Sequence, residues 1–135
     1  MNINEICKKA HENAVAHGWW GEDRPFSEQI ALMHSELSEA LEEYRDGRGL
    51  DEVYYYCEFS NKKIKGDEET AWGCEKQPDC NGCEYGKPEG IPIELADVII
   101  RIADTCGRYG IDLEYAIKIK MEYNKTRPYK HGKKI

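Results

Sequence analysis

The amino-acid sequence predicts a small all-α protein, a bundle of four to five helices with a loop-rich, cysteine-containing insert between its two central helices. Two observations lead to this prediction. Apolar residues recur at intervals of three and four along four segments, and glycine or proline stands near the ends of these segments. A chain of 135 residues has the length of one ordinary domain, so we expect a single domain over residues 1–135 with the insert at about residues 50–90.

The first two predicted helices lie on either side of a short loop that contains two tryptophans. The first helix covers about residues 3–17, where apolar residues keep helical spacing as far as Gly18. Ser27 is the expected N-cap of the second helix, which continues to about Asp46. Gly47 then follows as the expected C-terminal stop of that helix.

Two further helices are predicted in the last third of the chain. The third begins at Ile91 and Pro92, where a proline in the first turn does no harm, and it ends before Gly110. Asp112 can cap a fourth helix that continues to about Lys125. These four helices account for most of the chain outside the insert.

The insert has a different composition from the helical segments. Around residues 54–56, which are three tyrosines, we expect a short strand or an irregular turn, followed by a loop-rich stretch without helical periodicity. A loop of this length without structure of its own is uncommon in a compact domain, so we expect a specific interaction to hold it in place.

Four of the six cysteines lie in the insert and are candidate metal ligands. Cys80 and Cys83 form a Cys-x2-Cys pair, which allows two thiolates to share one Zn²⁺ ion. Cys57 and Cys74 would complete a tetrahedral structural zinc site. Free reduced thiols, an iron–sulfur cluster and disulfides are the alternatives for these cysteines.

The other two cysteines and the lack of long apolar segments indicate in which cell compartment the protein works. Cys7 and Cys106 lie on apolar helix faces, and we expect both to be small core residues. The N-terminal segment lacks the apolar core of a signal peptide, and no run approaches the roughly 18 apolar residues of a membrane span. We therefore expect a cytoplasmic protein with reduced thiols and no membrane partner.

The charge of the chain argues against binding to nucleic acid polymers. Lysine and arginine number 19 against 26 acidic residues, which gives a formal net charge of -7. Binding to a phosphate backbone requires clustered positive charge, so a general nucleic-acid-binding protein is not expected. The last 18 residues nevertheless hold seven basic residues against one acidic residue, Glu122. This basic segment is either a phosphate-binding arm or a solvated tail.

Two predicted helices carry the same pattern of carboxylates. At about 100° per residue, Glu39 lies about 60° from Glu36 on the second helix, and Asp97 lies about 60° from Glu94 on the third. In both helices the acidic pair borders an apolar stripe that we expect to form the core. The expected stripe residues are Met33, Leu37, Ala40, Leu41 and Tyr44, and Ile91, Leu95, Val98, Ile99 and Ile102.

If the two stripes pack together, the four carboxylates converge. Carboxylates at close quarters raise each other's pKa unless a cation lies among them. Ligand sets made of oxygen alone suit Mg²⁺ or Mn²⁺, which usually keep waters or take substrate phosphates as well. Since a single Glu-x-x-Glu pair is usually solvated surface, the matched pair on the second helix is what favours a metal site.

These residues carry a resemblance to a known family. The two pairs form an ExxE…ExxD pattern, and residues 32–43 (LMHSELSEALEE), 87–98 (KPEGIPIELADV) and 120–132 (KMEYNKTRPYKHG) extend the similarity. The chain resembles the MazG-like family of the all-α nucleoside triphosphate pyrophosphohydrolases over most of residues 1–47 and 87–135. The insert departs from this pattern, because relatives join the two motif helices by much shorter connections.

The resemblance implies a function and a set of site residues. The family hydrolyses nucleoside triphosphates, often deoxynucleotides, to the monophosphate and pyrophosphate with a metal-activated water as the nucleophile. Glu36, Glu39, Glu94 and Asp97 would then be the catalytic Mg²⁺ ligands. Relatives of this size are usually homodimers or homotetramers, which we also expect here.

Substrate-binding residues are predicted on three other segments. Lys120, Asn124 and Arg127 are spaced to share one face of the fourth helix and suit triphosphate oxygens, although basic residues also favour a helix C-terminus. Lys125, Lys130 and Lys133 are weaker candidates. His11 and Trp20 match positions that help to line the base pocket in some relatives. For these two, ordinary packing of the tryptophan and a surface or capped histidine are the alternatives.

Two other functions are compatible with the sequence. The protein would be a non-catalytic helical module, stapled by zinc, that binds a partner through the insert, or it would bind a nucleotide for sensing without turnover. Release of pyrophosphate that depends on Mg²⁺ distinguishes the enzyme from both alternatives.

Overall fold

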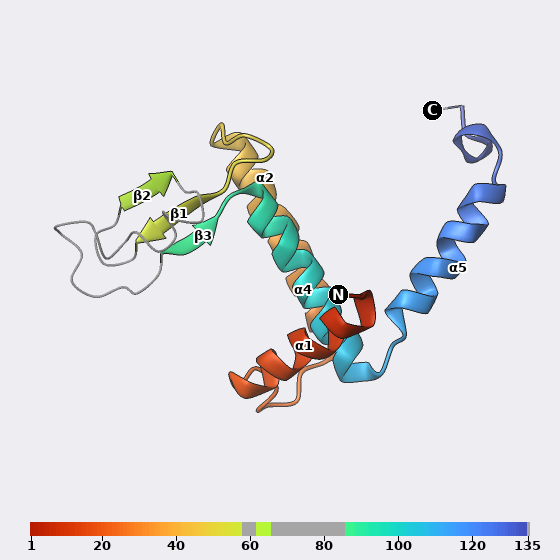
Figure 1. The fold of residues 1–135 in the computed structure, drawn as a ribbon, viewed down its shortest axis with the longest axis horizontal. Helices are drawn as coiled ribbons and strands as arrows, with labels where there is room; N and C mark the ends of the chain where they lie inside the picture. Colours follow the sequence, from red (N-terminus) through yellow and green to blue (C-terminus); the bar gives the residue numbers. More distant parts are fainter. Residues whose placement is uncertain (58–61, 66–85, 135) are drawn as a thin grey trace. The chain divides into compact units, whose positions relative to one another are not determined.

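The computed structural model describes residues 1–57, 62–65 and 86–134. Their helices and strands, in chain order, are α1 (Ile3–Ala16), α2 (Phe26–Arg45), β1 (Tyr54–Cys57), β2 (Lys62–Lys65), β3 (Lys87–Glu89), α4 (Ile91–Tyr109), α5 (Leu113–Thr126) and the short 3-10 helix η2 (Tyr129–Gly132). Figure 1 shows that helices make up most of the described chain. The prediction of a mainly helical fold is therefore confirmed.

The helix ends follow the predicted signals closely. Gly18, Gly47 and Gly110, which follow α1, α2 and α4, have φ angles of 82°, 83° and 67°, a left-handed conformation that glycine adopts without strain. Asp112 caps α5 by accepting a 3.1 Å hydrogen bond from the backbone N–H of Tyr115. The second helix begins at Phe26, so the prediction of Ser27 as its N-cap is wrong. Pro25 precedes this helix, and its fixed φ allows the chain to enter the helix two residues earlier than an N-cap at Ser27 would.

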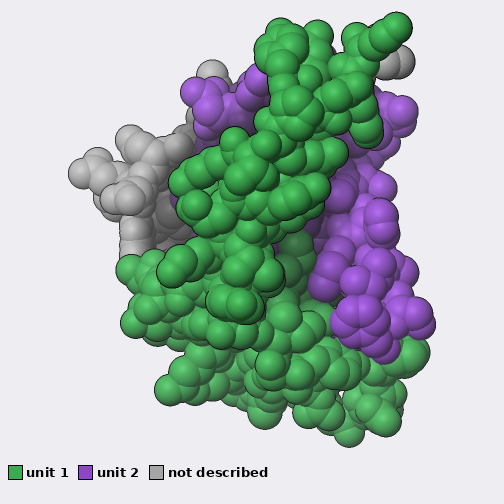
Figure 2. Space-filling model, turned by 90° about the vertical axis from the view of Figure 1, so that its right-hand side faces the viewer, with its two compact units in different colours: residues 1–25, 100–135 green, residues 26–99 purple. Residues whose placement is uncertain are grey.

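The chain divides into two compact units, which Figure 2 colours separately. Unit 1 comprises residues 1–25 and 100–135, and unit 2 comprises residues 26–99, so that α4 contributes to both. In unit 1, Cys7 and Cys106 are buried with Ala103, and this confirms their prediction as core residues. Partly buried apolar side chains pack around this cluster; they are Ile3, Ile6, Ala10, Ile102 and Leu113.

Unit 2 contains a small sheet that the sequence predicted only in part. The three strands are antiparallel in the order β2-β1-β3, and Tyr54 of β1 pairs with Lys65 and with Glu89. A short strand or an irregular turn was expected around residues 54–56, and the structure has a strand there; the two flanking strands were not expected. Tyr54 is 2% exposed, and the Arg48 guanidinium lies 3.9 Å from its ring centroid. Strand β1 is thus anchored in unit 2 through Tyr54, and β3 pairs with it.

The apolar stripes predicted as core are only partly buried. Within unit 2, Ala40, Ile91 and Val98 are buried. Other members of the stripes are exposed: Leu37 (47%), Leu41 (49%), Tyr44 (61%), Leu95 (47%) and Ile99 (56%). The buried face of α2 instead contains Glu36, at 8% exposure, beside Ala40. Glu36 therefore lies within the packed face of the helix, whereas the sequence predicted it at the border of that face.

The length and apolar character of the helices decide whether any of them could cross a membrane. Among the residues that the structure describes, no helix combines the length and the apolar character that crossing a membrane requires.

Candidate metal centre

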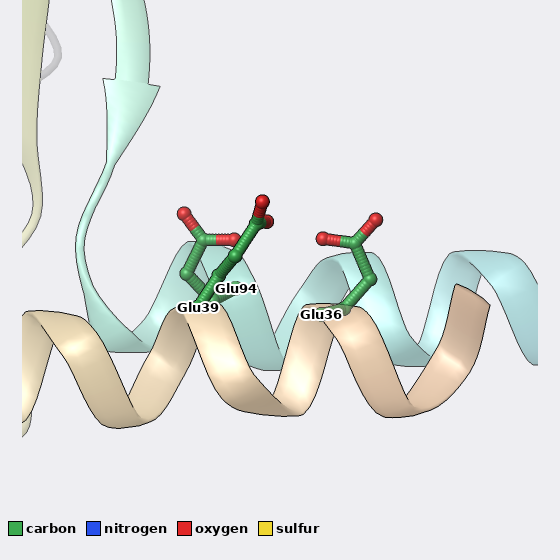
Figure 3. A group of neighbouring side chains, drawn as sticks. All are labelled: Glu36, Glu39 and Glu94. Atoms are coloured by element: carbon green, nitrogen blue, oxygen red, sulfur yellow. The ribbon is translucent and has the colours of Figure 1, made fainter. Parts of the chain in front are cut away.

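Three of the predicted carboxylates come together in unit 2. Glu36 and Glu39 lie on α2, and Glu94 lies in the first turn of α4. Carboxylate oxygens of these three residues all lie within 4.8 Å of one another. Figure 3 shows the three side chains on the same side of the helix pair, with their carboxylates close together. The three residues, called the glutamate cluster below, bring ligands from two separate helices to one place.

Local sequence features fix each glutamate in this arrangement. Glu36 and Glu39 are three residues apart, so they lie on one face of α2. Strand β3 leads into α4 through Gly90, whose carbonyl accepts hydrogen bonds of 3.0 Å from the backbone N–H groups of Ile93 and Glu94. This turn begins the helix and places the Glu94 carboxylate in its first turn, where the helix dipole favours a negative charge.

Asp97 lies beside the glutamate cluster without being one of its three members. It is half-buried and follows Glu94 by three residues on α4. Its charge is close enough to contribute to the raised pKa of Glu94. The structure therefore assembles three of the four predicted ligands and places the fourth next to them.

The electrostatics of the cluster indicate a shortage of positive charge. Burial, followed by a hydrogen bond with Glu39 and the charges of its acidic neighbours, raises the pKa of Glu94 to about 7. A hydrogen bond with Glu36, together with burial, raises the pKa of Glu39. Carboxylates that share protons in this way are the groups whose ionised form a divalent cation would stabilise.

Lys87, which was not among the predicted site residues, lies near this cluster. Lys87 Nζ is 3.4 Å from Glu89 Oε1, two residues along strand β3. Although burial would lower the pKa of Lys87, the carboxylates of Glu89, Glu94 and Glu39 raise it above its usual value. In the sequence, only its position in the KPEG segment, just before the helix that carries Glu94, could have indicated that Lys87 lies near the cluster.

The predicted base-pocket residues lie in unit 1 and contact a common partner. His11 Nδ1 is 2.8 Å from Asp104 Oδ1, and the Trp20 indole N–H donates to the two oxygens of Asp104 at 2.9 and 3.1 Å. The Arg108 guanidinium lies over the Trp20 ring, 4.8 Å from the ring centroid, and the Tyr109 ring makes a T-shaped contact with it, with 6.4 Å between the centroids. The structure thus brings His11 and Trp20 together through Asp104, a residue that no motif in the sequence pointed to.

Two of the predicted phosphate-binding residues, Lys120 and Asn124, lie on α5 in unit 1, and the third, Arg127, is the C-cap of this helix. Lys120 Nζ and Arg127 Cζ lie 5.0 and 5.6 Å from the centroid of the Tyr123 ring, so the two cations share one side of the helix. Asn124 is exposed on the same helix. Lys125 forms an ion pair of 2.8 Å with Glu122 and is therefore engaged within the helix.

The predicted zinc site falls outside the part of the chain that can be described. Cys74, Cys80 and Cys83 lie outside the described residues, and so does the side chain of Cys57. The hypothesis of a zinc site therefore stays a prediction from the sequence.

Comparison with known proteins gives no independent assignment. No protein-family model matches the sequence, and neither a curated protein nor a solved structure matches it. The resemblance to the MazG-like family therefore rests on the motifs and on the glutamate cluster that they place in unit 2.

Proposed function

We propose that this protein is a Mg²⁺- or Mn²⁺-dependent nucleoside triphosphate pyrophosphohydrolase of the MazG-like type. The observation that carries the proposal is the convergence of Glu36, Glu39 and Glu94 from two helices, with oxygens within 4.8 Å of one another. A ligand set made only of carboxylates fits a hard divalent cation better than a soft metal.

The glutamate cluster would hold the metal, and Asp97 lies close enough to contribute to its charge. A bound Mg²⁺ ion would neutralise phosphate oxygens and lower the pKa of a coordinated water. Glu36, which is 8% exposed, provides a rigid ligand inside the packed face of α2. Glu94, in the first turn of α4, provides a ligand from the second helix.

Residues of unit 1 are proposed to bind the rest of a nucleotide, with a deoxynucleoside triphosphate as the expected substrate. Lys120, Asn124 and Arg127 offer donors that suit phosphate oxygens. His11 and Trp20 are the proposed base-binding residues. The indole N–H of Trp20 is already bonded to Asp104 and the Arg108 guanidinium lies over its ring, so a base would have to stack on the face of the ring away from Arg108.

We also propose that the protein forms a homodimer or homotetramer. Leu37, Leu41 and Tyr44 on α2 and Leu95 and Ile99 on α4 are between 47% and 61% exposed. Apolar helix faces of this kind are usually buried in helix bundles, and a second copy offers the same helices for such packing. A reduced, cytoplasmic setting fits the free thiols of Cys7 and Cys106.

The test is a product analysis. The purified protein is incubated with canonical and modified nucleoside and deoxynucleoside triphosphates, with Mg²⁺ and then with excess EDTA, and the products are separated by anion exchange. Monophosphate and pyrophosphate in equal amounts, lost on chelation, support the proposal and identify the substrate class. Nucleotide binding without turnover would replace it with a sensing function, and the absence of both binding and turnover would favour partner binding through the insert.

A further inference from the structure

Strand β3 of the insert is held in a fixed position next to the glutamate cluster. It pairs with β1, with Lys87 opposite Tyr56 and Glu89 opposite Tyr54. The hydroxyl of Tyr54 in turn donates a 2.7 Å hydrogen bond to Glu43 Oε1, on the helix that carries Glu36 and Glu39. Figure 3 shows the strand rising from the start of α4 on the side to which the three carboxylates point. Strand β3 of the insert therefore forms one side, or wall, of the candidate metal centre.

The side chain of Lys87 lies on this wall with its ammonium group accessible. Lys87 and Glu89 are two residues apart on a strand, so their side chains lie on the same face, as their 3.4 Å ion pair confirms. The Lys87 side chain is 61% exposed, whereas that of Glu89 is 19% exposed. An ammonium group has three donors, so one ion pair leaves donors for a further ligand.

The charge of Lys87 acts on the same carboxylates that the proposed metal would bind. Both Glu94 and Glu39 lie within electrostatic range of its ammonium group. A divalent cation bound by these glutamates would replace the positive charge that Lys87 now supplies to them. The ammonium group would then be free to contact the negative oxygens of a triphosphate entering the same place.

We propose that Lys87 binds a non-bridging oxygen of the polyphosphate chain. This inference rests on the proposed function and extends it, because it assigns to the insert a residue that contacts the substrate. The chemistry recognised is a polyphosphate, so inorganic tripolyphosphate and a nucleoside triphosphate both qualify as ligands. Lys87 therefore has two opposite effects. Without phosphate, its charge competes with the metal ion and weakens metal binding; with a polyphosphate present, it strengthens the binding of the polyphosphate.

The opposite effects of Lys87 on metal affinity and on phosphate affinity provide the test. Lys87→Met removes the charge, Lys87→Arg keeps it, and Lys9→Met is a matched control because Lys9 is an exposed lysine of α1. Mn²⁺ affinity without phosphate is measured by electron paramagnetic resonance. The affinity for tripolyphosphate and for a deoxynucleoside triphosphate with a non-hydrolysable α,β-bridge, both at saturating Mn²⁺, is measured by calorimetry.

For Lys87→Met we expect Mn²⁺ to bind roughly threefold more tightly and both phosphate ligands to bind about tenfold to hundredfold more weakly. Lys87→Arg should retain most of the phosphate affinity, and Lys9→Met should change neither quantity. A loss of both affinities in Lys87→Met would indicate a structural role and overturn the inference, as would unchanged phosphate binding.

These outcomes are independent of turnover. Weaker analogue binding in Lys87→Met together with an inactive wild-type protein would refute the proposed hydrolysis and leave the phosphate-binding role of Lys87 standing. An active wild-type enzyme with the same analogue affinity in Lys87→Met would refute the inference and leave the proposed function standing.

Discussion

The hydroxyl group of Tyr54 donates a 2.7 Å hydrogen bond to Oε1 of Glu43, and this bond joins the first strand of the insert to helix α2. The second oxygen of Glu43 is buried without a hydrogen-bond partner. Burial, with the nearby carboxylates of Glu43 and Glu89, raises the pKa of Tyr54, so the phenol stays protonated as a donor. Through this contact the insert becomes part of the wall of the candidate metal centre.

Removing the Tyr54 hydroxyl should therefore destabilise the protein. Tyr54→Phe leaves Oε1 of Glu43, in a partly buried contact, without its donor, and we expect the free energy of unfolding to fall by about 1–3 kcal/mol. Chemical denaturation measures the change. Tyr44→Phe is the control, because Tyr44 is 61% exposed and should tolerate the loss of its hydroxyl. Equal stability of the two variants would show that the Tyr54–Glu43 bond does not hold the sheet.

The raised pKa of Glu94 predicts the pH dependence of stability without metal. Between its usual value of 4.5 and its folded value of about 7, the folded protein holds more protons than the unfolded chain. The contribution of Glu94 to the free energy of unfolding should therefore be largest below pH 4.5. This stabilising contribution should be lost as the pH rises through 7. Glu39, whose pKa is also raised, acts in the same direction.

Thermal denaturation in EDTA at pH 5, 6, 7 and 8 measures this dependence. The Tm of the wild-type protein should fall across this range relative to Glu94→Gln, which cannot ionise at that position. Addition of Mg²⁺ should raise the wild-type Tm more at pH 8 than at pH 5, because the ion stabilises the ionised carboxylates. A difference between wild type and Glu94→Gln that does not vary with pH would contradict the proposed charge repulsion.

Two conservative substitutions test the ligand set of the proposed enzyme. Glu39→Gln and Asp97→Asn each remove a hard anionic oxygen, so we expect turnover to be abolished while circular dichroism shows an intact fold. Steady-state release of pyrophosphate at saturating Mg²⁺ is the measurement. Glu12→Gln is a matched control, since Glu12 is an exposed residue of α1 in unit 1. Full activity of either site variant would remove that residue from the site.

Gly107 allows α1 to approach α4 closely in unit 1. A Cβ atom at this position would lie 2.6 Å from the Cβ of His11 and 2.8 Å from the carbonyl oxygen of Cys7. Alanine usually stabilises a helix relative to glycine. Here we expect Gly107→Ala to lower the free energy of unfolding by about 1–3 kcal/mol, because the two helices must move apart. In Gly49→Ala, where the nearest atom is 3.5 Å away, the cost should be absent. A stable Gly107→Ala protein would show that the approach is not tightly constrained.

The helices could be predicted from the sequence because their signals are local. The stop glycines at positions 18, 47 and 110 and the cap at Asp112 each act within a few residues of the helix end. The capping box of α1, in which Asn2 and Glu5 exchange hydrogen bonds of 2.9 and 3.1 Å, had an equally local signal but was not predicted. Spacing alone also placed Glu36 and Glu39 on one helix face.

What the sequence could not provide depends on contacts between distant residues. The wheel placed Glu36 at the border of the apolar stripe, whereas the structure buries it and exposes Leu37 and Leu41. Helical periodicity identifies an apolar face but does not decide which residues of that face are covered by the neighbouring helix. Asp104, which His11 and Trp20 both contact, is separated from them by 93 and 84 residues, and no local pattern marks such a contact.

The most direct test of the central claim is the position of a bound metal. A crystal grown with Mn²⁺ would give an anomalous difference map that locates the ion without assuming any activity. We predict a peak among the carboxylates of Glu36, Glu39 and Glu94, at ordinary ligand distance from oxygens of both α2 and α4, and no such peak in crystals of Glu94→Gln. Ordered density for the three side chains without a peak among them, at a saturating Mn²⁺ concentration, would contradict the assignment of a metal centre.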